Sequence, residues 1–180
     1  MAWNCTSIAR RRRGSAPRFA ACTSLVLAFA VSALTATPAA AANVRISGLS
    51  DVAFGTITNF TNDSVQSQSV CLYSKSPPSN NYNITASGSG TGGAFMLGSG
   101  SSTMAYELEW SDSPGQSVGS QLLANQPLTG QHSTASNAVD DCSKGPATTA
   151  SLIVILRSAA VTAASSGTYT GTLTLLVAPE

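Results

Sequence analysis

The end of the chain, residues 168–180, restricts the fold more than any other stretch. Threonines fall on one face of it, and the other face carries the side chains of Tyr169, Leu173, Leu175 and Val177. Alternation with period two indicates a strand with one buried side. Pro179 has no N–H to donate, so strand pairing should stop there. We expect this strand to close a β-sandwich.

The start of the chain has the pattern of a secretory signal peptide. A basic run at residues 10–13 precedes an apolar run at 19–34, and small residues at 40–42 offer a cleavage site. A retained membrane anchor is the alternative, but the apolar run is short for a spanning helix. We therefore predict a cleaved signal over residues 1–42 and a mature domain over residues 43–180 without a membrane span.

Removal of this segment reverses the charge of the protein. The whole chain has nine Lys and Arg against eight Asp and Glu. Five of the arginines lie before residue 43, which leaves four bases against eight acids and a net charge of −4. A nucleic-acid partner is not expected, because such proteins carry a basic stripe.

The mature part predicts an all-β domain. It is rich in Ser, Thr, Gly and Ala, and short apolar stretches alternate with turn-forming clusters. Five consecutive aliphatic residues, 152–156, indicate a strand buried on both faces. Residues 158–165 could form a helical turn or a plain crossover. The expected strands before the last one lie near residues 44–46, 49–55, 67–73, 82–86, 94–97, 104–110 and 149–157.

Two cysteines remain in the mature chain, Cys71 and Cys142. In an exported protein such a pair most simply forms one disulfide. A zinc site is the alternative, but a single histidine, His132, does not complete a ligand set.

No catalytic, cofactor-binding or metal residue is predicted, and the chain is not expected to be an enzyme. A Gly-x-Gly-x-x-Gly match at residues 88–93 lacks the strand, helix and βαβ context of a dinucleotide site. His132 lies in a polar segment, and no serine sits in a nucleophile elbow. The acidic pairs at 107/109 and 140/141 are expected to be solvated surface groups.

Several motifs together resemble the spore coat protein U-like domain family, which includes the pilins of archaic chaperone–usher pili. Residues 49–57 resemble its early strand motif, and residues 166–174 resemble its closing motif. The cysteine pair, residues 106–110 and residues 128–130 are similar to the middle of the same domain.

The resemblance implies an immunoglobulin-like, pilin-type β-sandwich that lacks one strand. A periplasmic chaperone, and then another pilus subunit delivered at an outer-membrane usher, would supply that strand. The implied protein is an exported fimbrial subunit on the cell surface, with roles in adhesion and biofilm formation. An ordinary complete core is the alternative. The candidates to line the acceptor groove are Leu152, Val154, Leu156, Leu173, Leu175 and Val177.

The N-terminal side of the domain departs from the family pattern. Only residues 43–48 precede the first motif, and Val44 and Ile46 are the candidate donor-strand residues. This piece is short for a donor strand, so the chain could accept a strand without donating one. The other functional interpretation is a free-standing secreted module that binds glycans or surfaces, with Trp110, Tyr106 or Tyr82 as stacking residues.

Overall fold

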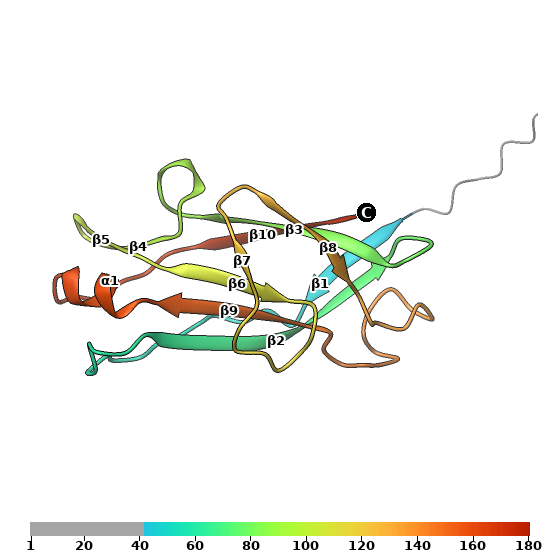
Figure 1. The fold of residues 1–180 in the computed structure, drawn as a ribbon, viewed down its shortest axis with the longest axis horizontal. Helices are drawn as coiled ribbons and strands as arrows, with labels where there is room; N and C mark the ends of the chain where they lie inside the picture. Colours follow the sequence, from blue (N-terminus) through green and yellow to red (C-terminus); the bar gives the residue numbers. More distant parts are fainter. Residues whose placement is uncertain (1–41) are drawn as a thin grey trace, which may run out of the picture. The chain divides into compact units, whose positions relative to one another are not determined.

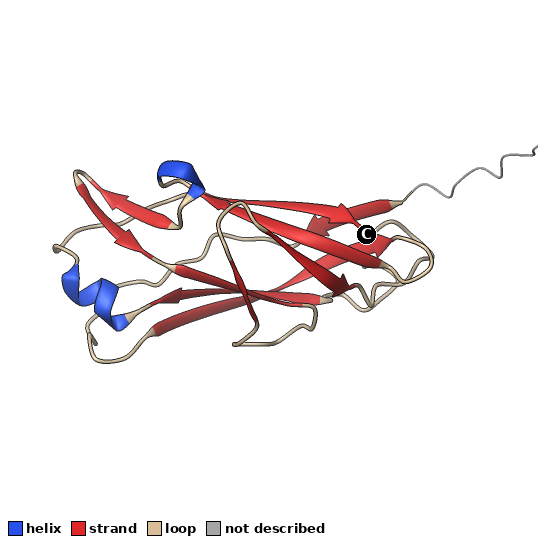
Figure 2. Cartoon of the chain, turned by 45° about the horizontal axis from the view of Figure 1, so that its top comes forward, coloured by secondary structure: helices blue, strands red, loops and turns tan. Residues whose placement is uncertain are grey.

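The computed structural model describes residues 42–180, drawn in colour in Figure 1. The predicted signal peptide lies almost entirely outside these residues. The described part is built mainly from antiparallel strands, with the short helical segments that Figure 2 draws in blue. This confirms the predicted all-β class and the sandwich of antiparallel sheets.

Two sheets form the sandwich. The larger has the order β1-β2-β9-β6-β7, with the bounds Asn43–Ser47, Ser64–Lys75, Ala150–Leu156, Glu107–Ser111 and Ser120–Leu122. The smaller has the order β10-β3-β8, with the bounds Leu173–Pro179, Asn81–Gly88 and Pro127–His132. A separate hairpin, a 3-10 turn and a helix complete the domain: β4 (Met96–Ser99), β5 (Ser102–Ala105), η1 (Thr91–Gly93) and α1 (Ser158–Ala163).

Strand β9 is the centre of the larger sheet. All of its residues are buried, which confirms the prediction from its aliphatic run. It pairs with β2 on one side and with β6 on the other, so both of its backbone edges are satisfied within the sheet. The loop after β6 covers part of the outer face, where the Gln116 N–H donates to Ser151 Oγ at 3.0 Å.

A threonine hydroxyl continues the contact between β2 and β9 beyond their ladder, which ends at Val70 and Ala150. Thr149 Oγ1 accepts the Leu72 N–H and donates to the Leu72 carbonyl, both at 2.8 Å. Thr149 is buried, so this hydroxyl satisfies backbone groups that water cannot reach.

The disulfide between Cys71 and Cys142 is present, with a Cα–Cα distance of 5.9 Å. It belongs to a small second cluster with Tyr73 and Ala135, apart from the main core. The Tyr73 hydroxyl donates to Asp140 Oδ1 at 3.1 Å. Burial and the Asp140 carboxylate together raise the pKa of Tyr73. The disulfide therefore fixes the polar segment after β8 against the outer face of β2.

Three sequence expectations about strands were wrong. Residues 49–55 form no strand, because they have no backbone partner in the described chain. The stretch 104–110 is divided at Tyr106 between β5 and β6, although its inward alternation is retained. Strands β7 and β8 were not among the expected strands, because both are short and mostly exposed.

The two long sides of the sandwich differ. On one side the chain passes from β7, the edge of the larger sheet, to β8, the edge of the smaller sheet, and these strands are in contact. On the other side, β1 contacts β10 over only part of its length, and no described strand lies between the sheets beyond it. The sandwich is therefore open along this side.

Candidate functional site

The open side contains a groove with a volume of about 1480 Å³. One bank is the start of β10 with the chain that leads into it, residues 164–175. The other bank is residues 49–57, which we call the wall segment. Side chains from β9, β5 and the β5–β6 junction line the groove between them.

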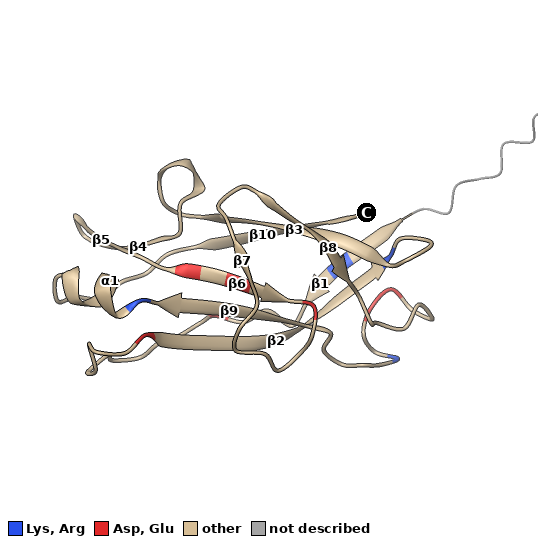
Figure 3. Cartoon of the chain, in the orientation of Figure 1, with Lys and Arg blue, Asp and Glu red and all other residues tan. Residues whose placement is uncertain are grey.

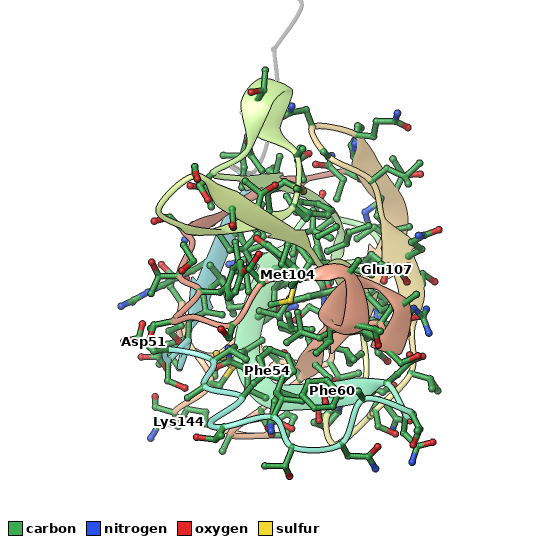
Figure 4. The ribbon with its side chains drawn as sticks, turned by 90° about the vertical axis from the view of Figure 1, so that its left-hand side faces the viewer. Asp51, Phe54, Phe60, Met104, Glu107 and Lys144 are labelled. Atoms are coloured by element: carbon green, nitrogen blue, oxygen red, sulfur yellow. A yellow bond between two sulfur atoms is a disulfide. The ribbon has the colours of Figure 1, made fainter. Side chains whose placement is uncertain are left out.

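The floor of the groove is apolar. Leu152, Val154 and Leu156 project into it from the inner face of β9, and Met104 and Tyr106 lie beside them. All five belong to the main core. Burial raises the pKa of Tyr106, whose ring lies 5.6 Å from the ring of Phe95. In Figure 4, Met104 lies in the middle of the view, between the wall segment and the β4–β5 hairpin.

Strand β10 presents an unpaired edge to the groove. Among the described strands it pairs only with β3, on its far side. Leu173 and Leu175 line the groove and are half-buried, whereas Leu176 points to the other face and is 65% exposed. An edge of this kind offers main-chain N–H and C=O groups to a further strand.

The wall segment is the second unpaired edge. It makes no backbone–backbone hydrogen bond with the rest of the described chain. Phe54 and Ile57 pack against the core, whereas Leu49 is 44% exposed and Phe60, just beyond the segment, is 53% exposed. Asp51, Phe54 and Phe60 mark this run along the lower part of Figure 4. The chain here carries several apolar side chains and has no strand partner among the described residues.

The first strand closes one end of the groove. Residues Asn43 to Ser47 of β1 pair with residues Lys75 to Cys71 of β2. Val44 and Ile46 pack on the core together with Val177. The candidate donor-strand residues therefore lie in a strand of their own domain, next to the C-terminal half of β10.

The groove has little charge. Asp51 is the one charged side chain among the described residues that line it. The hairpin and β10 are likewise uncharged before Glu180, as Figure 3 shows. An occupant of this groove would therefore present uncharged, apolar side chains to the floor.

A charge cluster lies where β9 ends. Arg157 pairs with Asp63 at 2.8 Å and with Glu107 at 2.5 Å, and so connects the starts of β2 and β6. Figure 3 shows the blue position at the start of α1 between these two red ones. Hydrogen bonds from the Ser158 N–H and the Arg157 guanidinium lower the pKa of Asp63. This cluster fixes α1, whose Val161 lines the groove.

Five of the six residues predicted from the sequence line this one groove. They are Leu152, Val154, Leu156, Leu173 and Leu175; Val177 lies beyond the groove, next to β1. Sequence reasoning missed Met104 as a floor residue and the wall segment as a bank. The apolar residues of the wall segment are visible in the sequence, but their pattern predicts a paired strand.

The aromatic residues proposed for glycan stacking do not form an exposed surface. Trp110 is 0% exposed, and Tyr82 and Tyr106 are also buried. Trp110 Nε1 donates to the Tyr82 hydroxyl at 2.9 Å inside the core. The alternation of these aromatic residues with polar ones in the sequence reflects the burial of their side chains in the core, not a binding surface.

The described residues contain neither a metal-ligand cluster nor a membrane-spanning helix. Over residues 42–180, no three His, Cys, Asp or Glu side chains lie close enough together to hold a metal ion. The same residues contain no helix with the length and hydropathy needed to cross a membrane.

Comparisons with known proteins gave one kind of match. No protein-family model matches the sequence, and no curated protein is similar to it. Among solved structures, a chain from a chaperone–tip adhesin complex, described as vital for activating the biogenesis of CFA/I fimbriae, is 17% identical with a TM-score of 0.47. The match covers 77% of this chain and 42% of that chain, so this protein spans less than half the length of the matched one.

Proposed function

We propose that this protein is a non-enzymatic subunit of a surface pilus, structural or adhesive, whose groove receives a β-strand from another protein. The observation that carries the proposal is the groove itself. Two backbone edges without a strand partner, those of β10 and the wall segment, lie on opposite banks of an apolar, nearly uncharged floor.

A strand is the occupant whose chemistry suits this site. Strand addition supplies main-chain hydrogen bonds to an open edge, and alternate side chains fill the groove. A small apolar ligand would leave both backbone edges unpaired, at a cost for each group shielded from water. An open apolar edge without an occupant is a site for aggregation.

The donors would be those of the chaperone–usher route, in line with the family resemblance. A periplasmic chaperone would lend the strand after export, and a neighbouring subunit would replace it during assembly at an outer-membrane usher. The protein would then move from the periplasm to the cell surface.

The test is expression in the periplasm with and without the cognate chaperone, found as the product of a neighbouring gene. We expect a soluble one-to-one complex with the chaperone, and degradation or aggregation without it. Equal yields of soluble, protease-resistant protein from cells with and without the chaperone would refute the proposal. That result would instead favour a free-standing secreted module.

A further inference from the structure

Near its start, the wall segment is held by one side chain of β2, that of Gln68. The Ser50 N–H donates to Gln68 Oε1 at 2.9 Å, and the Ser50 hydroxyl donates to the same oxygen at 3.0 Å. Gln68 Nε2 donates to the Ser50 carbonyl at 3.1 Å. Gln68 also lines the groove.

This carboxamide engages the two groups that a neighbouring strand would engage. The β1–β2 ladder ends with Ser47 opposite Cys71, and Gly48 follows with a φ of +80°. A left-handed φ is readily adopted by glycine, so the chain can turn away from β2 at this point. Beyond the turn, the side chain of Gln68 replaces the backbone of β2 as the partner of the wall segment.

The replacement changes where the wall segment lies. Gln68 is opposite Leu152 of β9, on the face of β2 that looks into the sandwich. Its side chain holds the backbone of Ser50 over this inner face, and no ladder draws the segment into the edge of the larger sheet. The groove therefore has a second bank that stands apart from the sheet.

We infer that Gln68 is a positioning residue of the groove, which holds the wall segment ready to receive an incoming strand. The inference rests on the proposed function, because a positioned bank matters only if a strand arrives. The physical reason is preorganisation: a bank already in place does not have to be ordered when the strand enters.

The chain offers a matched control. Gln66 lies two residues earlier on the same face of β2, opposite Val154. It has the same side chain, but it makes no hydrogen bond with the wall segment. Replacing it changes the composition of the strand in the same way and leaves the contact with Ser50 intact.

The experiment compares Gln68→Ala, Gln68→Glu and Gln66→Ala in the chaperone-released domain. The probe is a synthetic peptide of alternating valine and threonine, as long as the wall segment, with a lysine at each end. Three quantities are measured: the hydrogen-exchange rate of the Ser50 amide without peptide, the rate at which peptide is captured, and the urea midpoint.

For Gln68→Ala we expect about tenfold faster exchange of the Ser50 amide and roughly tenfold slower capture, the size of effect given by one or two net hydrogen bonds. The urea midpoint should fall by no more than the loss of this one contact accounts for, because the rest of the domain is unchanged. Gln68→Glu keeps an acceptor for the Ser50 N–H and loses the donor to its carbonyl, so its effects should be intermediate. Gln66→Ala should behave as the parent.

The outcomes separate the two ideas. Unchanged Ser50 exchange in Gln68→Ala, or unchanged or faster capture by it, would overturn the role of Gln68 while leaving strand capture by the parent intact. A parent domain that captures no peptide and needs no chaperone would overturn the proposed function. If Gln66→Ala slowed peptide capture as much as Gln68→Ala does, the effect would reflect a general structural role of the strand. That result would also overturn the inference.

Discussion

Leu175 gives the sharpest test of the groove, because part of its side chain is still exposed and can be covered by a strand. It lines the groove from β10, whereas its neighbour Leu176 points to the opposite face and is 65% exposed. Complete burial of a leucine side chain stabilises by about 2–3 kcal/mol. Most of the side chain is already buried and accounts for roughly 2 kcal/mol in the free domain, and the exposed remainder should contribute up to about 1 kcal/mol when a strand covers it.

Leu175→Ala should therefore have two separable effects. The free energy of unfolding of the free domain should fall by about 2 kcal/mol, and strand affinity should fall by up to about fivefold, the equivalent of about 1 kcal/mol. Urea unfolding measures the first effect, and fluorescence anisotropy with a labelled chaperone strand measures the second. Leu176→Ala is the control and should change each by less than about 0.5 kcal/mol.

Two results would contradict this reasoning. If Leu176→Ala weakened strand binding as much as Leu175→Ala, the strand would bind the outer face of the smaller sheet. If Leu175→Ala left the affinity unchanged while lowering stability, the residue would belong to a core that a strand does not complete.

Three further predictions concern residues outside the groove that stabilise the domain. Thr149→Val should lower the free energy of unfolding by about 2 kcal/mol, because it leaves a buried backbone N–H unpaired, and Thr149→Ser should cost less than half as much; equal losses in urea unfolding would contradict this. Cys71→Ser should lower the free energy of unfolding by about 4–5 kcal/mol, since the disulfide to Cys142 spans 71 residues. An unchanged melting temperature under reducing conditions would contradict this stabilisation. The pKa of Asp63 is lowered from 3.8 by the Ser158 N–H and Arg157, so its contribution to stability is present above pH 4 and is lost as the pH falls through the lowered value. In Asp63→Asn, the melting temperature should no longer show this loss at acid pH. An unchanged dependence of the melting temperature on pH would show that the cluster does not contribute to stability.

The sequence alone determined the class of fold and most of the floor of the groove. The aliphatic run of β9 and the alternation of β10 each report the burial of a strand's own side chains, and this information is local. Two cysteines after residue 42 left one simple pairing. For these reasons the pattern of apolar residues is enough to assign Leu152, Leu156 and Leu175 to a shared core.

Only the tertiary structure decided which edges are paired. Residues 49–57 have the composition of a strand, yet they pair with no other strand of the described chain. Val44 and Ile46 are the candidate donor-strand residues, and in this structure they lie in β1, which pairs with β2 of the same domain. Hydrophobic alternation shows which side chains are buried and not which backbone lies alongside, because hydrogen-bond partners come from segments far apart in the chain. The opening of the groove, and the role of Gln68 in holding its second bank, follow from those distant contacts.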